Sequence, residues 1–431
     1  MKFHLISLGC PKNTVDSEGV AAELTRLGMT WVPGPEAADL VLLNTCGFIK
    51  DAKEESLRHV FRLLDLKRQR PRLQVAVFGC LVQRYRDDLR RDIPEIDHLF
   101  TFFDRASLAG LVQGIRLRAG QSHPEKPRRR FLTPAHLGFL KIAEGCDNRC
   151  SYCTIPDIRG PFRPRPLGEI MEDARTLAAT GAREISIIAQ DTARYGVAQG
   201  DPALLLELVR QVGELPTVRW IRLHYLHPRH LDGPFLEALF RLPKVVPYFD
   251  IPFQHVSDRI LALMNRGVTG KDLARLVGRI RRTFRRAVIR TTFIVGFPGE
   301  TEDDFQELLQ FIERHPIDRL GAFPYSPEEG TPAFKIRPRI SKAEKTRRLD
   351  ELMTLQQLLN FEKNQHKIDN VTEILIDGVG PDGIIGRTYG DAFEVDNSVL
   401  LPYDSTVAPG DFLRVRITGA EAYDLKGERI P

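Results

Sequence analysis

Between residues 133 and 338, six apolar runs alternate with amphipathic helical stretches, and this alternation limits the folds that the chain can adopt. The apolar runs are GFLKIA, REISIIA, RWIRLHY, PYFDIP, VIRTTFIVGF and RLGAFPY. Stretches such as LGEIMEDARTLAAT and TEDDFQELLQFIER separate them. Repeated βα units form parallel sheets with right-handed crossovers, so six units predict a partial, open relative of the eightfold barrel. The chemistry of such folds lies at the carboxyl ends of the strands.

The segments on either side have other patterns. Over residues 1–120, the apolar runs FHLISLG, ADLVLLN and LQVAVFG alternate with helical stretches, which predicts a doubly wound parallel sheet and an α/β fold class. Residues 121–132 are polar and basic, as in a linker, and lead into the central domain at 133–340. A charged connecting helix is expected over 341–366. In 367–431, the runs VTEILID, GIIGRT and FLRVRITG predict a small all-β barrel.

Half of the six cysteines lie within eight residues, in the stretch EGCDNRCSYCTIP directly after the first strand of the central domain. Cys146, Cys150 and Cys153 have the spacing C-x3-C-x2-C. A zinc site more often has two C-x2-C pairs or added histidines, and cysteines that merely pack usually occur singly. A four-iron cluster with three protein thiolates leaves one iron open to a cofactor or substrate. The spacing therefore favours an iron–sulfur cluster.

The other three cysteines also follow predicted strands. Cys10, Cys46 and Cys80 come after three strands of the N-terminal domain, at intervals of 36 and 34 residues. The carboxyl ends of neighbouring parallel strands lie side by side, so these thiols are expected to converge on a second metal site. The alternative for any one of them is a small core residue at a strand end.

Cysteine use and hydropathy together favour a cytoplasmic location. The stretch MKFHLISLGC is too short for a signal peptide or a membrane span, and no later apolar run is long enough to span a membrane. Because the cytoplasmic thiol pool is reducing, six cysteines are more often ligands or catalytic groups than disulfides. The net charge of +5 over 431 residues names no partner by itself.

The motif CDNRCSYC at the start of a βα repeat resembles the signature of the radical S-adenosylmethionine (SAM) superfamily. The resemblance implies that Cys146, Cys150 and Cys153 hold a 4Fe-4S cluster whose open iron binds SAM. One-electron reduction then cleaves SAM to methionine and a deoxyadenosyl radical. The family also places cofactor contacts at elements that here carry Tyr152 and Gln190. In the stretch GFPGE, Gly296 and Glu300 either form a Pro-Gly turn or let the backbone approach the adenosine of SAM.

The three segments together resemble the methylthiotransferases, whose N-terminal domain, radical domain and C-terminal TRAM barrel match nearly the whole chain. SLGCPKNTVDSE and NTCGFIKDAKEES resemble the branch that modifies ribosomal protein S12 rather than the transfer-RNA branch, which typically reads GCQMN. AQDTARYG, DIPFQHVSD, MNRG, GFPGET and YSPEEGTPA resemble the same branch. The stretch RGPFRPRP departs from it, since Pro164 stands where the family commonly has serine, and this bears on any substrate role of that loop.

The resemblance implies two 4Fe-4S clusters and SAM as cofactors, an electron donor such as flavodoxin, and no catalytic acid or base. The deoxyadenosyl radical would take hydrogen from the β-carbon of an aspartate of the small-subunit protein S12. The carbon radical would then take a methylthio group assembled at Cys10, Cys46 and Cys80, with its methyl from a second SAM. Two alternatives stay open. One is a transfer-RNA methylthiotransferase, and the other is a non-enzymatic iron–sulfur electron carrier, which normally ligates every iron with protein.

The charge of the C-terminal segment favours the protein substrate. Residues 367–431 contain six basic and twelve acidic residues, a net charge of −6, so the rest of the chain carries about +11. Gripping RNA requires Lys and Arg to neutralise phosphates, whereas an acidic surface attracts basic ribosomal proteins. We therefore expect the acidic TRAM domain to contact ribosomal protein S12, and RNA binding to be weak or incidental. The alternative is that these acidic side chains only keep the domain soluble.

Overall fold

The computed structural model describes residues 1–102, 108–110 and 131–430, which form two compact units. The first unit contains Met1–Thr133 with the short segments Gly145–Asp147 and Cys153–Phe162. The second contains Pro134–Glu144, Asn148–Tyr152 and Arg163–Pro431. All but the last two residues of the expected linker, 121–132, lie outside the described residues. Within the described ranges, no helix has an apolar stretch of the length that crossing a bilayer requires.

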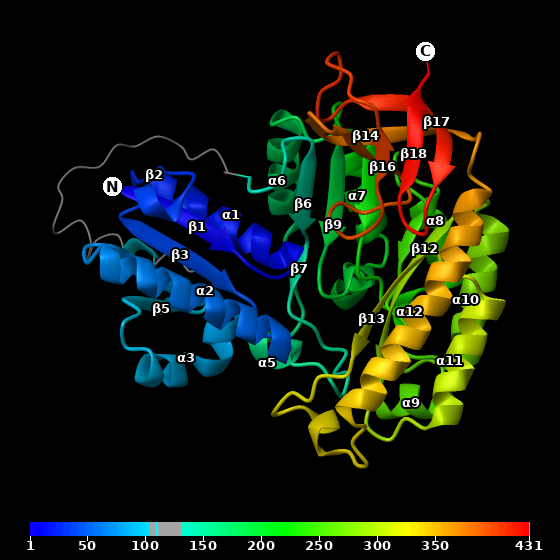
Figure 1. The fold of residues 1–431 in the computed structure, drawn as a ribbon, viewed down its shortest axis with the longest axis horizontal. Helices are drawn as coiled ribbons and strands as arrows, with labels where there is room; N and C mark the ends of the chain where they lie inside the picture. The colour runs from blue at the N-terminus through cyan, green and yellow to red at the C-terminus, as the bar shows by residue number, and fades with distance from the viewer. Residues whose placement is uncertain (103–107, 111–130, 431) are drawn as a thin grey trace. The chain divides into compact units, whose positions relative to one another are not determined.

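A five-stranded parallel sheet, in the order β2-β1-β3-β4-β5, forms the centre of the first unit (Figure 1). Its elements are β1 (Lys2–Ser7), α1 (Pro11–Arg26), β2 (Thr30–Trp31), β3 (Leu40–Thr45), α2 (Lys50–Gln69), β4 (Gln74–Gly79), α3 (Cys80–Asp92) and β5 (His98–Phe100). Along β3, Leu40 and Leu42 join a core with α1, whereas Val41 and Leu43 join a core with α2 and α3. Helices thus cover both faces of the sheet, and the predicted doubly wound fold is confirmed.

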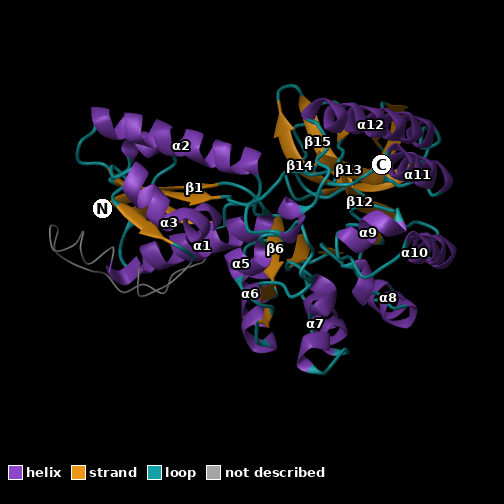
Figure 2. Cartoon of the chain, turned by 90° about the horizontal axis from the view of Figure 1, so that it is seen from below, coloured by secondary structure: helices purple, strands orange, loops and turns teal. Residues whose placement is uncertain are grey.

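Six parallel strands form the central barrel of the second unit, and the prediction of six βα units is confirmed. The strands are β6 (Leu137–Lys141), β9 (Glu184–Ile188), β10 (Trp220–Leu223), β11 (Tyr248–Asp250), β12 (Val288–Val295) and β13 (Arg319–Pro324). They form two sheets, β10-β9-β6 and β11-β12-β13, which a bridge between Ile221 and Val245 joins. Figure 2 shows the helices around the outside of these strands. They are α6 (Leu167–Ala179), α7 (Leu204–Gly213), α8 (Gly233–Phe240), α9 (Asp258–Leu263), α10 (Gly270–Thr283) and α11 (Glu302–Arg314).

Three short elements lie around the cysteine loop that follows β6. Strands β7 (Ala143–Glu144) and β8 (Arg163–Pro164) pair antiparallel, and α5 (Ile155–Arg159) belongs to the first unit. Pro164, the departure from the family pattern, is half-buried and pairs with Ala143 in this ladder. Its substitution therefore falls in a short strand next to the loop rather than on a free loop tip.

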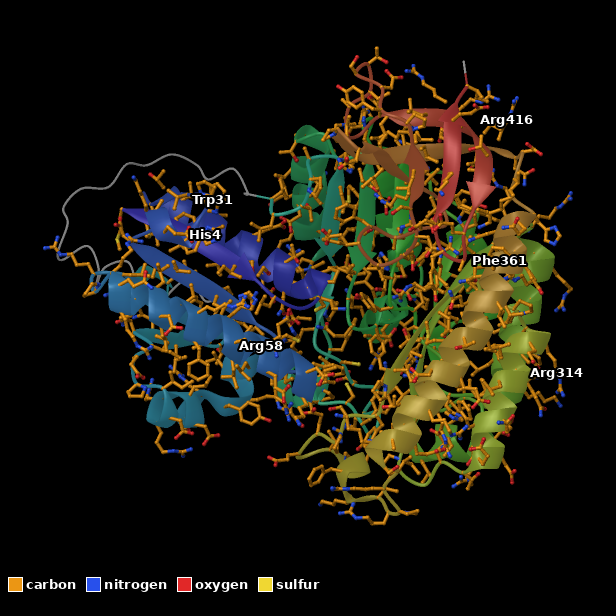
Figure 3. All side chains as sticks on the ribbon, in the orientation of Figure 1. His4, Trp31, Arg58, Arg314, Phe361 and Arg416 are labelled. Carbon is orange, nitrogen blue, oxygen red and sulfur yellow. The ribbon has the colours of Figure 1, made fainter. Side chains whose placement is uncertain are left out.

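The C-terminal barrel follows a long helix, α12 (Lys342–Gln365), whose N-terminus is capped by the Ser341 hydroxyl accepting from the Glu344 amide. The barrel is closed in the order β14-β15-β16-β18-β17. Its strands are β14 (Val371–Gly380), β15 (Gly383–Thr388), β16 (Val399–Leu401), β17 (Phe412–Ala420) and β18 (Leu425–Arg429). Inward side chains such as Ile376 and Val415 fill it. Phe361 of α12 and Arg416 of β17 are both about half exposed and are labelled in Figure 3.

Buried ion pairs attach the C-terminal barrel to the amino ends of the central strands. Glu184, the first residue of β9, accepts from Arg222 of β10 at 2.7 Å and from Arg387 of β15 at 2.5 Å. None of these three side chains is more than 3% exposed. Burial raises the pKa of Glu184, but the charges and hydrogen bonds of the two arginines outweigh it and lower that pKa to about 2. The carboxylate therefore stays ionised inside the protein.

Further ion pairs link the C-terminal barrel to the central strands. Arg319 donates to Asp391 at 2.8 Å, and Arg290 lies 3.0 Å from Asp250 and 3.4 Å from Asp396. At the start of β6, His136 lies 2.9 Å from Asp377. Asp377, Asp391 and Asp396 supply part of the net negative charge of residues 367–431. Their carboxylates are used inside the second unit rather than on its surface.

We expect Glu184→Gln to lower the free energy of unfolding by about 3–5 kcal/mol, because it leaves Arg222 and Arg387 buried beside an uncharged group. Urea denaturation of the full chain measures this change. Glu373→Gln is the matched control, because Glu373 and its partner Arg219 are 40% and 48% exposed, respectively. Such surface pairs contribute about 0–1 kcal/mol. Equal losses in both variants would contradict the role of burial.

The same carboxylate predicts an acid-sensitive stability. Glu184 has its pKa lowered from 4.5 to about 2 on folding, so its contribution is fully present above pH 4.5 and is lost as the pH falls toward 2. Over that range, the free energy of unfolding should decline less steeply in Glu184→Gln than in the parent. Denaturant titrations at several pH values provide the measurement, and parallel declines would assign the acid sensitivity to other groups.

Candidate metal centres

The carboxyl ends of β1, β3 and β4 are level in the first sheet. Ser7 pairs with Asn44, and Asn44 pairs with Phe78. Cys46 directly follows β3, Cys80 directly follows β4 as the first residue of α3, and Cys10 is the N-cap of α1. The structure therefore places the three N-terminal cysteines at one edge of the sheet, on neighbouring strands.

Glycines next to these cysteines permit the close approach. Gly79 has φ +97°, and a Cβ there would lie 2.2 Å from the Asn44 side chain and 2.8 Å from the Thr45 carbonyl oxygen. Gly9 has φ +89°, and a Cβ there would lie 3.3 Å from the Cys46 sulfur. A side chain at either position would strain the backbone and push the strand ends apart. The glycines in LGC and FGC thus allow the neighbouring cysteines to take these positions.

Burial favours the neutral thiols of Cys46 and Cys80 while no metal ion is bound. Burial raises the pKa of Cys80 to about 11, Arg159 opposes that rise, and the nearby Cys46 and Cys10 add to it. Burial also raises the pKa of Cys46, with Cys10 contributing. Three thiolates this close repel one another, whereas bound cations deprotonate thiols and remove that repulsion. A donor set of three thiols, with a guanidinium beside one of them, fits an iron–sulfur cluster with three protein ligands.

The second cysteine motif lies between β7 and α5. Within the first unit, the Cys146 amide donates to the Gly160 carbonyl at 3.1 Å, and the Cys153 sulfur accepts from the Ile155 amide at 3.4 Å. Within the second unit, Cys150 is buried, and its sulfur accepts from Nη1 of Arg266 at 3.3 Å. Each of the three residues therefore has at least one hydrogen bond that limits its freedom.

Hydrogen bonds also hold the backbone around Cys150. Ser151 donates from its amide to the Met264 carbonyl at 3.0 Å and from its hydroxyl to the Leu263 carbonyl at 2.7 Å. Asn265 donates to the Arg149 carbonyl at 2.9 Å. The segment after α9 thus fixes the middle of the cysteine motif.

In the part of the chain that the structure describes, no three Cys, His, Asp or Glu side chains are placed to hold one metal ion. A cubane takes each thiolate on a different iron, so its ligands need not meet at one point.

Tyr152 and Gln190, expected at the cofactor, both lie in the second unit and are half-buried. Tyr152 packs against the apolar cluster that contains Phe297 and Tyr325. Gln190 follows β9, and its Nε2 donates to Glu144 at 3.2 Å. Its Oε1 is buried and has no hydrogen-bond partner among the described residues. That oxygen is available to accept from a donor on a bound molecule.

Gly296 and Glu300 form a rigid turn after β12. Gly296 has φ +69°, and a Cβ there would lie 2.3 Å from the side chain of Lys345 on α12. Glu300 is 3% exposed; it accepts from the Phe297 amide at 2.9 Å and pairs with Arg348 at 2.7 Å. The turn interpretation therefore has direct structural support, and the Glu300 carboxylate is engaged within the protein.

Sequence reasoning did not single out the buried polar residues around these sites. Arg159 and Arg266 are each 4% exposed and donate to cysteine sulfurs, of Cys80 and Cys150 respectively. Asp191 is fully buried next to Gln190; it accepts from Asn148 at 2.7 Å, and burial raises its pKa. In the sequence, Arg159, Arg266 and Asp191 stand in the motifs IPDIRG, MNRG and AQDTARYG. These motifs do not show that the charged side chains are buried.

Three family models match consecutive parts of the chain. Residues 2–101 match the "Uncharacterized protein family UPF0004", residues 140–312 the radical SAM superfamily, and residues 368–430 the TRAM domain. Together with the two cysteine triplets, the fold defines a radical SAM enzyme with an additional N-terminal domain and a TRAM barrel, a methylthiotransferase architecture.

Full-length relatives narrow this class to one family. The chain is 39% identical to "Ribosomal protein uS12 methylthiotransferase RimO" of Caldicellulosiruptor saccharolyticus, with 100% of both chains covered. It is 41% identical to the protein of that name from Pelotomaculum thermopropionicum, with 100% of this chain and 99% of the relative covered. The protein of Aquifex aeolicus is 40% identical, with 99% and 97% covered. The chain belongs to the RimO family of methylthiotransferases, and it is a radical SAM enzyme.

Solved structures share the fold at low sequence identity. The radical SAM methyltransferase TsrM from Kitasatospora setae, with tryptophan substrate and a SAM analogue bound, has a TM-score of 0.55 and 14% identity, with 83% of this chain and 89% of that chain covered. TsrM with cobalamin and a [4Fe-4S] cluster bound has a TM-score of 0.54 and 15% identity, with 77% and 76% covered. These likenesses concern the fold alone.

If each triplet holds its own cubane, anaerobic reconstitution should load about eight irons per chain. Replacing Cys146, Cys150 and Cys153 together by alanine should leave about four, and so should the reciprocal replacement of Cys10, Cys46 and Cys80. Iron and acid-labile sulfide assays on the purified variants measure this. Loss of all iron in either triple variant would mean one shared site.

Proposed function

We propose that this chain adds a methylthio group to the β-carbon of an aspartate of ribosomal protein uS12, using two 4Fe-4S clusters and SAM. The observation that carries the proposal is the full-length similarity, at 37–41% identity, to proteins named uS12 methylthiotransferase. The two cysteine triplets at the carboxyl ends of parallel strands support the chemistry, since that is where such folds bind ligands.

In this proposal, the chain's own residues bind the clusters and SAM and orient them. Cys146, Cys150 and Cys153 would hold one cluster, and Cys10, Cys46 and Cys80 the other. When bound, these groups and SAM supply a deoxyadenosyl radical and the methylthio group to be transferred. Gln190 offers its buried Oε1 to a donor of the cofactor, and Tyr152 offers a half-buried ring. Glu300, paired with Arg348, holds the turn after β12 in place.

Buried histidines near the strand ends do not act as bases in this proposal. Burial lowers the pKa of His227 to about 2 and that of His255 to about 3, so both stay neutral near pH 7. His227 accepts from the Arg229 amide at 3.2 Å, and His255 accepts from the Ser257 amide at 3.0 Å. A radical hydrogen abstraction needs no general base, which agrees with these structural roles.

The surface charge of the TRAM barrel is smaller than its sequence suggests, because part of it is buried in ion pairs. Asp382 and Glu394 remain exposed and are available to a basic partner. We propose that they help to attract uS12, that RNA binding is weak, and that the enzyme works in the cytoplasm with a reductant such as flavodoxin. Electrostatic attraction of this kind acts mainly on the encounter of the partners.

Product analysis tests the function directly. Incubation with SAM, sulfide, reductant, isolated uS12 and transfer RNA should add a methylthio group to an aspartate of uS12 and leave the RNA unmodified. Mass spectrometry of both substrates is the measurement. Modification of the RNA alone would assign the chain to transfer-RNA methylthiolation, and failure to cleave SAM would favour an electron carrier.

Variants of the two triplets test the division of labour. Replacing Cys10, Cys46 and Cys80 by alanine should spare SAM cleavage and abolish methylthiolation, since only the second cluster is lost. Replacing Cys146, Cys150 and Cys153 should abolish both. Chromatography of deoxyadenosine, together with the uS12 mass, provides the two readouts. Methylthiolation by the first variant would refute the proposed roles.

Charge reversal tests how the substrate is chosen. In the full chain, Asp382→Lys with Glu394→Lys should weaken uS12 binding by about 2- to 30-fold at low salt, because each exposed pair contributes about 0.2–1 kcal/mol. The difference should shrink at high salt. Asp303→Lys with Glu313→Lys, exposed on α11, is the control with the same change in net charge. Equal weakening in both pairs would mean that only net charge matters.

A further inference from the structure

A buried guanidinium lies beside the N-terminal cysteines in the first unit. Arg159 is the last residue of α5 and lies only six positions after Cys153 in the sequence. Its side chain is 2% exposed. One short segment therefore carries a ligand expected for one cluster and a charge that lies next to the ligands of the other.

The contacts of Arg159 fix where its charge lies. Nη1 donates to Asp16 at 2.9 Å, and Nη2 donates to Asn13 at 2.6 Å and to the Cys80 sulfur at 3.7 Å. The guanidinium also lies 4.6 Å from the ring of Phe102. These partners surround the group on several sides and leave Nη2 directed toward the sulfur.

Asn13 is itself held in one orientation. Its Nδ2 donates to the Leu8 carbonyl at 2.9 Å and to the Thr45 carbonyl at 3.2 Å, so its Oδ1 faces Arg159 and Cys80. Both carbonyls belong to residues at or just beyond the strand ends that precede the cysteines. The position of Arg159 is therefore tied to the edge of the sheet that presents the thiols.

We propose that Arg159 is a positioning residue for the cluster of Cys10, Cys46 and Cys80, where it donates to the Cys80 sulfur and raises the reduction potential of that cluster. The inference rests on the second cluster of the proposed function. A hydrogen bond and a positive charge next to a ligand sulfur stabilise the more negative, reduced state, and both are known determinants of cluster potentials.

The alternative is a purely structural ion pair between Arg159 and Asp16. Two observations favour the proposal. Nη2 is directed away from Asp16 toward Asn13 and the sulfur, and a second buried arginine, Arg266, makes the same kind of contact with Cys150. A neutral thiol is a weak acceptor, so a charged donor beside it gains most when the sulfur carries charge.

The test isolates the second cluster. In full-length protein with Cys146, Cys150 and Cys153 replaced by alanine, the remaining cluster is titrated by electron paramagnetic resonance in three further variants. Arg159→Met removes charge and donor. Arg159→Lys keeps the charge but loses the planar fork of donors, and Asp16→Asn breaks the ion pair but keeps the guanidinium. The iron content of each reconstituted variant and the thermal unfolding of its iron-free form are measured in parallel.

At a fixed potential, Arg159→Met should lower the ratio of reduced to oxidised cluster at least tenfold, a shift of about 59 mV for one electron. Arg159→Lys should fall between it and the parent. Asp16→Asn should not lower the ratio, although it should destabilise the iron-free protein as Arg159→Met does. If Arg159→Met does not fold, the Arg159→Lys shift decides the result.

Two results overturn the inference in distinguishable ways. An unchanged potential and spectrum in Arg159→Met and Arg159→Lys, with about four irons bound, would leave Arg159 a structural residue and the proposed function intact. Absence of iron in the background protein would remove the second cluster, and with it both the inference and the proposed function.

Discussion

The polarity of parallel strands is the constraint on which the functional parts of this chain depend. Every strand of the first sheet and of the central barrel runs in the same direction as its neighbours, so residues just past the strands gather at one edge. Cysteines follow β1, β3, β4 and the first strand of the central barrel. Topology thus places the cysteines at the strand ends, and glycines such as Gly79 leave room for the close approach there.

Most of the fold could be predicted, because long apolar runs identify strands. The missed strands are two to five residues long. Five of them are too short to show a period, namely β2, β5, β7, β8 and β16, and β18, LKGER, is largely polar. Helix α3 is kinked at Tyr85 and buries few apolar residues, which weakens its pattern. The positions of the six cysteines after strands were predicted from their spacing along the chain. Arg159 and Arg266 were not, because their partners Asp16 and Cys150 lie 143 and 116 residues away.

The net charge of residues 367–431 was a poor guide to the surface charge of the folded barrel. A sum over residues 367–431 counts Asp391 like any surface carboxylate, although it is 2% exposed and pairs with Arg319. The arginines that neutralise these acids lie on other elements, so no local pattern shows that they will be buried. Net charge of a domain describes its surface only when the domain is not attached through its charged residues.

The attachment of the C-terminal barrel also sets its distance from the carboxyl ends of the central strands. It contacts the amino ends of the central strands, whereas Gln190 and the segment that holds Cys150 lie at their carboxyl ends. Strand β12 has eight residues, which at about 3.3 Å per residue separates the two ends by roughly 25 Å. A macromolecule gripped by the C-terminal barrel must therefore extend over the length of the central barrel to present its reacting carbon. A substrate too small to span that distance would bind and remain out of reach.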